Sequence, residues 1–575
     1  MDRPRTKQVC TIGPASADKI PDLVAAGMDV ARVNFSHGTA DDHRAYVHAV
    51  RAAAHSARRS VAVMVDLPGP KLRLGELDGG QAVLLTGGRF TLRSEVRAAP
   101  VPEMPAEPIA EPAPEPTVAV DLPTETEATT AAGAEPDATA EPDATAAEPD
   151  AAAAEPDAAA AEPDAVAAEP DAVAASTEPV SVVDASPDTA RTDDDTTGHV
   201  QAHSVETGDA SGALVRGANL STLAQVGDRV LLADGAAELR VTAIDGSDVA
   251  TEIVNGGLVR SRCGVNVPSE RFGDGGLTDD DRAAVPRALD LRVDLLAQSF
   301  VRSAADVVAL KALLPADGPR VVAKIETRAA LDDFDAICAA ADGIMVARGD
   351  LGVDIPFEDV PSIQKDLVRR ATAAGRFTIV ATQMLESMIG AGRPTRAEAS
   401  DVANAVLDGA DAVMLSAETA IGSHPVEALS AMERICRAAE QHDRSPAARA
   451  ADPATAITLA ATAMAASGGV EGIWCFTRTG RTAELLSIHR PPVPVVAFTL
   501  SPVVARRLAV RSGVIPLVLP AGAKNSPLIE QMEAAWRAQR SGADYDTVLL
   551  LTTSSQPQGI NRLEIHRLGG SGRGT

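Results

Sequence analysis

The stretch IMVARGDLGVDIP, residues 344–356, decides the fold: a short apolar run of aliphatic residues ends abruptly in charge and glycine. The segment VVAKIETRAAL, residues 321–331, shows the same pattern just upstream. A buried parallel strand is a nearly continuous apolar run, and polar residues begin where the strand ends. The two segments therefore predict parallel strands with polar side chains at their carboxyl ends.

The polar residues at these two strand ends form a candidate site. Lys324 and Glu326 are two positions apart and lie on one side of an extended chain, and Arg348, Gly349 and Asp350 follow the second run. Two carboxylates suit a hard divalent cation such as Mg²⁺, which also keeps water and substrate phosphate as ligands. Taken alone, Lys324 and Glu326 read more readily as an ordinary surface ion pair.

Similar apolar runs recur along the chain and alternate with stretches of helical length. Three lie in QVCTIGPAS, DVARVNFSHG and VAVMVDLPGPKLRLG, and five follow at Leu295–Gln298, Val321–Lys324, Gly343–Val346, Thr378–Ala381 and Ala412–Leu415. Eight strands with polar motifs at their ends predict a TIM barrel. A doubly wound open sheet is the alternative, but its first turn is expected to read GxGxxG, and TIGPAS does not.

The remaining segments predict further domains. Residues 1–68 and 269–440 form the two parts of the barrel, and residues 69–96 and 211–268 contain short alternating runs that predict a small antiparallel β domain on a barrel loop after strand 3. Residues 441–575 contain IWCFTRTG, VPVVAFTL and DTVLLLTT as further strands. We expect them to form a C-terminal α/β domain.

An acidic segment at residues 97–210 interrupts this small β domain. It repeats EPD, has 27 acidic residues against two arginines, and lacks Phe, Trp and Tyr. Such a composition cannot offset the entropy of ordering, so we expect a disordered spacer, with an acidic interaction arm as the alternative. Most of the net charge of −28 comes from this segment, so the rest of the chain is nearly neutral.

Composition also narrows the class of protein. Five cysteines without paired spacing favour a reducing compartment, and the chain has neither an apolar leader nor a membrane-length apolar run. Basic residues are not clustered, so we expect no nucleic-acid and no membrane partner. Only seven of the 52 basic residues are lysines, and two of them, Lys71 and Lys324, lie in polar motifs after predicted strands.

Six long motifs occur in order: TKQVCTIGPAS, ARVNFSHG, AKIE, DGIMVARGDLGVDIP, ATQMLESM and RPTRAEASDVANAVLDGADAVMLSAETAIG. Together they resemble the pyruvate kinase family over essentially the whole chain except the acidic segment. The resemblance implies transfer of the phosphoryl group of phosphoenolpyruvate to ADP in glycolysis, giving pyruvate and ATP. It also implies a homotetramer, a small β-barrel lid domain inserted after strand 3 in residues 69–96 and 211–268, and a regulatory role for the C-terminal domain. The composition described above predicts a cytoplasmic location. A weakly active or inactive regulatory paralogue that binds phosphoenolpyruvate or a sugar phosphate is the alternative.

The resemblance also implies roles for individual residues. Glu326 and Asp350 would ligate Mg²⁺, or Mn²⁺ in its place, while Arg32 and Lys324 would hold the phosphoryl group. Thr382, with Ser416 nearby, would serve the protonation step. The backbone amides of Gly349 and Asp350 would bind the substrate carboxylate, and the nucleotide would contact Asn34, His37 and Arg73.

Three features depart from the family pattern or stay open. The monovalent-cation ligands map onto Asn34, Ser36, Asp66 and the carbonyl of Leu67, but Lys71 replaces a glutamate common in the family, which predicts activity without K⁺. Cys263 replaces a common lysine that faces nucleotide phosphate, with Arg262 as a neighbouring cation. A sugar-phosphate or nucleotide effector would bind the loop of Thr477, Thr479, Gly480, Arg481 and Thr482; an unused turn before a helix is the alternative.

Overall fold

The computed structural model describes residues 3–94, 211–217, 219–233, 235–268, 271, 276–442, 452–520, 527–539, 546–552 and 562–568. The described residues all belong to one of the two units into which the chain divides, the unit Met1–Ala99 and Ser204–Thr575. The predicted disorder of residues 97–210 lies outside the described residues. The remainder of the chain carries every element discussed below.

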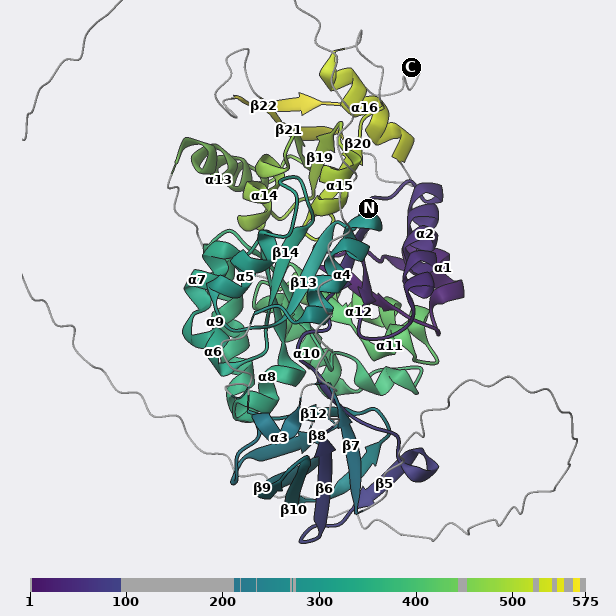
Figure 1. Cartoon of the computed structure of the whole chain (residues 1–575). Coiled ribbons are helices and arrows are strands. Elements are labelled where there is room, and N and C mark those ends of the chain that lie inside the picture. The colour runs from purple at the N-terminus through teal and green to yellow at the C-terminus, as the bar shows by residue number, and fades with distance from the viewer. Residues whose placement is uncertain are drawn as a thin grey trace, which may run out of the picture. The chain divides into compact units, whose positions relative to one another are not determined.

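Eight parallel strands close into a barrel, drawn at the centre of Figure 1. They are β1 (Lys7–Ile12), β2 (Val30–Asn34), β3 (Ala62–Asp66), β13 (Leu295–Val301), β14 (Arg320–Ile325), β15 (Gly343–Ala347), β16 (Phe377–Ala381) and β17 (Ala412–Leu415). Their order around the barrel follows the chain, and β17 closes the ring by pairing with β1, with Lys7 opposite Ala412. The predicted TIM barrel is confirmed, and the open sheet is excluded.

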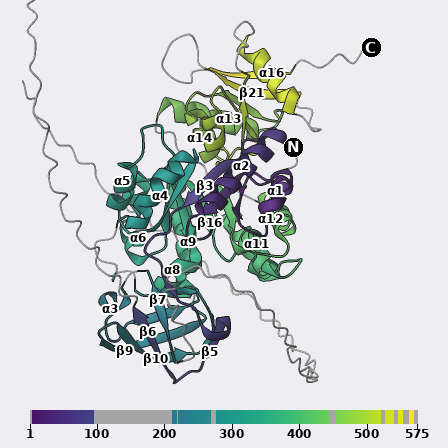
Figure 2. The ribbon, with the colours of Figure 1, turned by 45° about the vertical axis from the view of Figure 1, so that its right-hand side comes forward.

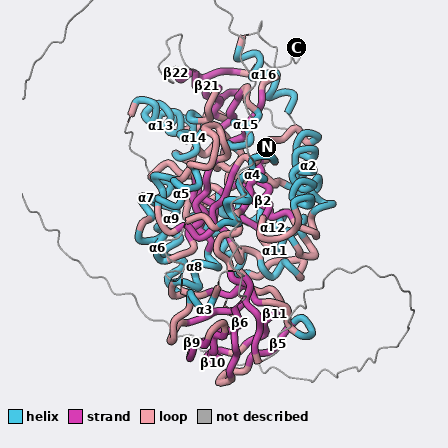
Figure 3. The backbone as a smooth tube through the Cα atoms, in the orientation of Figure 1, coloured by secondary structure: helices cyan, strands magenta, loops and turns pink. Residues whose placement is uncertain are grey.

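Helices surround the barrel strands, as the cyan and magenta tubes of Figure 3 show. The longer ones are α1 (Ile20–Ala26), α2 (Ala40–Ser56), α4 (Asp279–Asp290), α5 (Ala304–Lys311), α7 (Phe334–Ala340), α9 (Val360–Ala373), α10 (Arg396–Leu407) and α12 (Pro425–Glu440). Short helices α6 (Arg328–Asp332), α8 (Arg348–Asp354) and α11 (Ala417–Ala420) start close behind β14, β15 and β17. Capping boxes at Thr39, Thr278 and Thr395 fix where α2, α4 and α10 begin.

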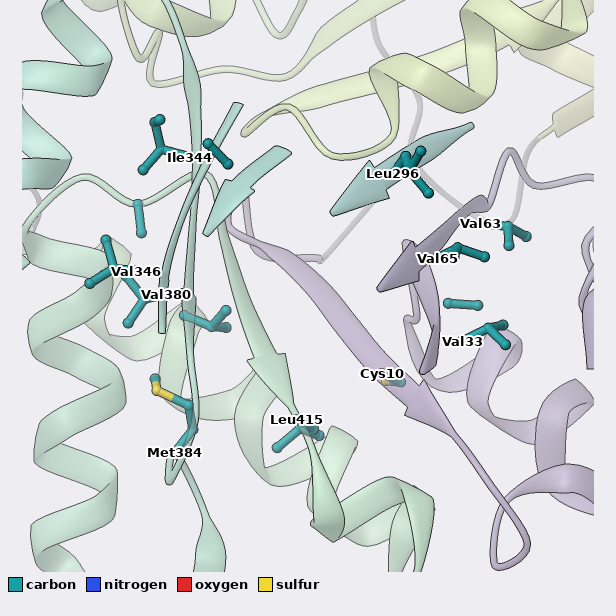
Figure 4. Packing of buried hydrophobic residues seen from close by; sticks show 14 of the residues in the cluster. Cys10, Val33, Val63, Val65, Leu296, Ile344, Val346, Val380, Met384 and Leu415 are labelled. Carbon is teal, nitrogen blue, oxygen red and sulfur yellow. The ribbon is translucent and has the colours of Figure 1, made fainter. Parts of the chain in front are cut away.

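Both faces of the barrel strands are buried, which explains the continuous apolar runs. Val63 and Val65 belong to the large cluster packed between strands and helices, part of which Figure 4 shows. The alternate residues Ala62 and Met64 belong to a separate inner cluster. That inner cluster also includes Ala509 and Val510 of the C-terminal domain.

The lid is a second closed barrel inserted after the third strand, as predicted. Its strands are β4 (Leu72–Leu74), β6 (Arg89–Ser94), β7 (Gly212–Arg216), β8 (Arg229–Leu232), β9 (Ala237–Asp245), β10 (Asp248–Asn255) and β12 (Gly264–Asn266), in the order β10-β6-β7-β4-β12-β8-β9. A two-stranded sheet joins β5 (Gln81–Leu84) to β11 (Gly257–Arg260). Figure 2 shows β6, β7, β9 and β10 grouped in this domain.

One strand pair of the lid differs from the antiparallel arrangement that we expected. β6 and β7 are parallel, with Thr91 opposite Gly212 and Ser94 opposite Val215. Alternating hydrophobicity identifies strands but not their direction, so the sequence pattern could not distinguish the two arrangements. Parallel neighbours need a crossover connection, and the acidic segment lies within this crossover.

The C-terminal domain is a five-stranded sheet with helices, as predicted. It contains α13 (Pro453–Ala466), β18 (Ile473–Phe476), α14 (Arg481–Ile488), β19 (Val495–Thr499), α15 (Pro502–Leu508), β20 (Val514–Val518), α16 (Leu528–Gln539), β21 (Thr547–Thr552) and β22 (Arg562–Arg567). The strand order is β20-β19-β18-β21-β22, and only β22 runs antiparallel to its neighbour among the described strands of this sheet.

Two buried carboxylates join this domain to the barrel. Asp294 accepts hydrogen bonds from the Val63 amide at 2.9 Å and from Arg506 of α15 at 2.8 Å. Asp411 accepts hydrogen bonds from the amides of Thr378 at 3.0 Å and Ser512 at 3.1 Å. Within the described residues, no helix combines the length and the apolar character needed to cross a membrane.

Candidate active site

A cavity of about 430 Å³ lies at the carboxyl ends of the barrel strands, where β4 and β12 of the lid also contribute to its wall. Most of the predicted site residues line it: Arg32, Asn34, His37, Lys71, Arg73, Lys324, Glu326, Asp350, Thr382 and Ser416. Four others, Ser36, Asp66, Leu67 and Gly349, are not among the lining residues. The structure therefore brings strand ends that are far apart in sequence to one cavity.

Lys324, the last residue but one of β14, is buried at the centre of this site. Its ammonium lies 2.8 Å from Glu326 Oε1 and 3.3 Å from Asp66 Oδ1, and it donates a 2.8 Å hydrogen bond to Ser299 Oγ. Burial alone would lower the pKa of Lys324, but Asp66, Glu326 and Asp350 outweigh it and raise that pKa. Lys324 is therefore a permanently charged ammonium inside the cavity.

Arg32 is fixed on β2 by the neighbouring strands. Its guanidinium donates to Asp66 Oδ2 through Nε at 2.9 Å and to Thr11 Oγ1 at 2.9 Å, with a second bond to Asp66 at 2.5 Å. Although burial favours protonation of Asp66, Lys324 and Arg32 hold its pKa well below the ordinary range. Three of the five donors of the guanidinium are used in these bonds, so two remain for an anion in the cavity.

Glu326 and Asp350 have the features of a divalent-cation site. Glu326 Oε2 accepts a 2.6 Å hydrogen bond from the Phe300 amide, and its buried Oε1 lies 2.8 Å from the Lys324 ammonium. Burial raises the pKa of Glu326, against the effect of Lys324. The pKa of Asp350 is lowered because Lys71 and Lys324 outweigh its burial.

The two carboxylates of Glu326 and Asp350 fit Mg²⁺ better than a metal ion that needs several protein ligands. The described residues contain no group of three or more His, Cys, Asp or Glu that could hold an ion by themselves. Mg²⁺ commonly takes one or two carboxylates and completes its shell with water and substrate phosphate. The carboxylates of Glu326 and Asp350, which both line the cavity, supply that number.

The end of β13 contributes residues that the sequence analysis did not identify. A bulge between Gln298 and Val301 shifts the register of β13 against β14, and Phe300 has a φ of +53°. The bulge places Ser299 Oγ on Lys324 and on the Leu67 carbonyl, and the Phe300 amide on Glu326. A hydroxyl at the carboxyl end of a barrel strand was the available signal for Ser299.

Thr382 lies directly after β16 in an unusual backbone conformation. Thr382 and Gln383 have φ values of +70° and +54°. The Thr382 hydroxyl accepts a 2.7 Å hydrogen bond from the Gly349 amide and donates one of 2.6 Å to the Ala381 carbonyl. The Gly349 amide, predicted to bind a substrate carboxylate, is therefore engaged by Thr382 in this structure.

Arg348 is a further residue whose role the sequence did not reveal. Its guanidinium donates to the Thr382 carbonyl at 2.8 Å and to Asp401 Oδ1 at 2.6 Å. By contrast, the buried hydroxyl of Ser416 has no hydrogen-bond partner among the described residues. Ser416 and Thr382 both line the cavity, so one hydroxyl there is committed to the backbone and the other is available.

The lid side of the cavity carries the predicted nucleotide residues. Arg73 of β4 lies 3.3 Å from His37 Nε2. Burial lowers the pKa of His37, and Arg73, Lys71 and Arg32 lower it further. Cys263 is half-buried against the lid core, and Arg262 pairs with Glu76 at 2.5 Å; neither lines the cavity, so Arg262 does not replace the family lysine there.

Lys71 contacts other residues than the predicted monovalent-cation ligands. The Lys71 ammonium lies 3.7 Å from Asp350 Oδ2 and 5.5 Å from the centre of the Phe300 ring. Three of the four predicted ligand oxygens already have protein partners: Asp66 binds Arg32, the Leu67 carbonyl accepts from Ser299, and Asn34 Oδ1 accepts from the Ser36 amide at 3.0 Å.

The predicted effector loop follows β18. Thr477 Oγ1 accepts a 2.9 Å hydrogen bond from the Gly480 amide, and Gly480, with a φ of +98°, caps α14. Thr477 and Thr482 are buried, whereas Thr479 and Arg481 are exposed. One turn further along α14, Glu484 pairs with Arg320 of β14 at 3.2 Å.

A TIM barrel with a buried ammonium, a braced guanidinium and two adjacent carboxylates below a β lid defines a phosphoryl-transfer enzyme, because that chemistry needs positioning and charge neutralisation. The family model "Pyruvate kinase, barrel domain" matches residues 3–100 and 184–429, and "Pyruvate kinase, alpha/beta domain" matches residues 455–566. The chain belongs to the pyruvate kinase family.

Individual relatives agree with this assignment. A pyruvate kinase of Mycobacterium tuberculosis is 33% identical over 576 residues, which cover 98% of this chain and 98% of that protein. A pyruvate kinase of Geobacillus stearothermophilus is 33% identical over 98% of this chain and 80% of its own length. Pyruvate kinase PKLR of Rattus norvegicus is 32% identical over 89% of this chain and 75% of its own length.

Proposed function

We propose that this protein transfers the phosphoryl group of phosphoenolpyruvate to ADP, giving pyruvate and ATP in glycolysis. The observation that carries the proposal is the position of Lys324, a buried ammonium between Asp66 and Glu326 at the floor of the cavity. A fixed charge there neutralises the transferring phosphoryl group and the enolate that forms when it leaves.

The neighbouring residues have distinct roles in this proposal. Arg32 holds the phosphoryl group with the donors that Asp66 and Thr11 leave free. Glu326 and Asp350 hold Mg²⁺ or Mn²⁺, which supplies additional neutralisation of phosphate charge when bound. On the lid side, Asn34, His37 and Arg73 contact the phosphates of the nucleotide.

Protonation of the enolate requires a hydroxyl or a water held on the opposite side of the substrate. We assign this step to Thr382 acting with Ser416. The Thr382 hydroxyl is held in place by its hydrogen bonds to the Gly349 amide and the Ala381 carbonyl. The Ser416 hydroxyl, which has no hydrogen-bond partner among the described residues, holds or relays the proton. The substrate carboxylate faces the first turn of α8 at Asp350, and at Gly349 once its bond to Thr382 is released.

Activity without K⁺ is part of the proposal. The Lys71 ammonium lies near Asp350 at the edge of the cavity, where it supplies a positive charge in place of a monovalent cation. Asp66 and the Leu67 carbonyl accept hydrogen bonds from Arg32 and Ser299, which also supports activity without K⁺.

Regulation and assembly extend the proposal beyond the cavity. A sugar phosphate or nucleotide effector is assigned to the loop Thr477–Thr482, and a homotetramer to the whole protein, both by family resemblance. A cytoplasmic location agrees with the buried thiols of Cys10, Cys338, Cys436 and Cys475, which form no disulfide.

The test is pyruvate formation from phosphoenolpyruvate, ADP and Mg²⁺, with and without K⁺, for the wild type and Lys324→Met. Turnover in both salts that Lys324→Met abolishes is the expected result. Turnover only with K⁺ contradicts the role of Lys71 alone. Binding of phosphoenolpyruvate without turnover in either salt would favour the inactive regulatory paralogue.

A further inference from the structure

A second cavity, of about 670 Å³, lies between α2 and α4, on the outer side of the barrel. Its volume is in the range of small-molecule sites. Its apolar part consists of the buried Phe35 and Val47 and the half-buried Leu291, and charged side chains surround this part. We call this cavity the α2–α4 groove.

The charges lining the groove are strongly unequal. Five arginines face one acidic residue, Asp290: they are Arg44, Arg51, Arg287, Arg292 and Arg506. Three of the arginines are already paired, because Arg51 and Arg506 bind the buried Asp294 and Arg44 binds Asp41. The two at α4, Arg287 and Arg292, have no carboxylate partner in the part of the chain that the structure describes.

The inner end of the groove contains an unsatisfied polar atom. His43 is buried, with its ring stacked on Phe35 at 4.4 Å between centroids. Its Nε2 lies 2.7 Å from the His37 carbonyl and must donate there, because a carbonyl only accepts. The neutral ring then presents Nδ1 as an acceptor, which is buried with no partner among the described residues, although unpaired buried polar atoms are uncommon. Nδ1 therefore suits a hydroxyl group of a ligand, and the arginines suit its phosphate.

We propose that the α2–α4 groove is a binding site for a small phosphate-bearing anion. Arg287 and Arg292 supply unpaired guanidinium groups, which bind phosphate through paired donors. Arg287 lies over the Phe35 ring at 5.0 Å and is thereby held at the groove. The apolar wall of Phe35, Val47 and Leu291 suits the carbon skeleton of a phosphate ester better than a bare inorganic ion.

The groove is connected to the cavity of the barrel through one short segment. The His43 ring stacks on Phe35 and lies 2.7 Å from the His37 carbonyl, and the His37 ring lies 3.3 Å from Arg73 at the cavity of the barrel. An occupied groove would therefore restrain His37 and lower the KM for ADP. This consequence, unlike the binding itself, rests on the proposed function.

Binding is tested without turnover by calorimetric titration of the full chain with inorganic pyrophosphate in metal-free buffer. The proteins compared are the wild type, the double variant Arg287→Ala/Arg292→Ala and the control Arg282→Ala, which changes an exposed arginine of α4 outside the groove. Phosphate sites at the barrel cavity and the effector loop are the same in all three. The double variant should weaken one binding event about tenfold or more, and Arg282→Ala should not.

A second measurement reads the groove directly in the wild type. The ring resonances of His43, assigned with His43→Gln among the ten histidines, should shift on addition of pyrophosphate. Identical titrations of all three proteins, equal weakening by Arg282→Ala, or unmoved His43 resonances would each overturn the proposal. A catalytically inactive chain that still shows the shift would contradict the proposed function but not this site.

Discussion

The guanidinium of Arg348 donates a 2.8 Å hydrogen bond to the carbonyl oxygen of Thr382. Thr382 and Gln383 both have positive φ, a conformation that costs on the order of 1–3 kcal/mol for each such residue. Arg348 is itself held by Asp401 at 2.6 Å and Gln364 at 3.3 Å. Arg348 is thus a positioning residue that stabilises a strained turn next to the substrate cavity.

Replacing Arg348 by lysine should separate positioning from charge. Lysine keeps the charge but cannot form several bonds in one plane, so the hydroxyl of Thr382 would shift. We expect Arg348→Lys to lower kcat roughly ten- to a hundredfold with little change in the KM for ADP, in steady-state assays. Arg369→Lys on the exposed side of α9 is the control, and equal kcat values in both variants would refute the role.

Removing one carboxylate should reveal the divalent-cation site. Glu326→Gln keeps the size of the side chain and deletes its charge, so we expect kcat to fall on the order of 100-fold and the half-saturating Mg²⁺ concentration to rise. The measurement is turnover against Mg²⁺ concentration. Glu358→Gln, an exposed residue outside the cavity lining, should behave as the wild type; an unchanged Mg²⁺ requirement in Glu326→Gln would contradict the assignment.

The charge of Lys71 should determine the salt requirement. Lys71→Glu adds a carboxylate near Asp350 and removes the ammonium, so we expect turnover to become at least about tenfold higher with K⁺ than without it. Turnover is compared in potassium and tetramethylammonium chloride. Lys19→Glu makes the same charge change at an exposed residue outside the cavity lining and should stay independent of K⁺. Equal rates of Lys71→Glu in the two salts would disprove the argument.

The crossover between β6 and β7 sets a minimum length for the connection within the lid. Ser94 lies opposite Val215, four residues beyond Ser211, so Ser94 and Ser211 are about 13 Å apart along the strands. Deleting residues 97–210 leaves three peptide links, which span at most about 11 Å. We expect this deletion to break the β6–β7 pair.

A connection of adequate length should restore the lid. A Gly/Ser linker of about 12 residues in place of 97–210 meets the need of a parallel crossover, and we expect turnover within a few-fold of the wild type. Thermal unfolding and turnover of both deletions provide the comparison. Full activity of the bare deletion would show that β6 and β7 need not be paired.

The environment of His37 predicts a pH profile. Because burial and Arg73 lower its pKa below the ordinary 6.5, His37 is neutral in the free enzyme throughout the range above pH 6.5. Its inflection in kcat/KM for ADP, which reports the free enzyme, should lie below pH 6.5. Arg73→Gln removes a positive neighbour and should move the inflection upward; His37→Gln should abolish it. An inflection that neither Arg73→Gln nor His37→Gln changes would belong to another titrating group and would contradict this prediction.

The barrel could be predicted from sequence because burial on both faces makes each strand a continuous apolar run. The C-terminal sheet was harder to predict. β20 contains Pro516, which argues against a central strand, and the structure places β20 at the sheet edge, where proline is tolerated. β22 is the other edge strand and has no fully buried residue, so it lacks an apolar run.

Some residues of the candidate site could likewise be predicted from the sequence, and others could not. Charged residues at strand ends, such as Lys324 and Asp350, could be recognised because polar groups there break an apolar pattern. The bond of Ser299 to Lys324 depends on a bulge in β13, and the bond of Arg348 to Thr382 depends on a turn of positive φ. Neither the bulge nor the turn has a glycine or proline at the decisive residue to mark it.

The ion pair between Arg320 and Glu484 has a consequence for signalling within the molecule. Strand β14 begins at Arg320 and ends six residues later at Ile325. The site residues Lys324 and Glu326 therefore lie at its far end. Glu484 belongs to the helix that starts at the candidate effector loop. A conformational change in that loop would thus reach the phosphoryl-binding residues through a single strand, so an effector should tune affinity for phosphoenolpyruvate before affinity for ADP.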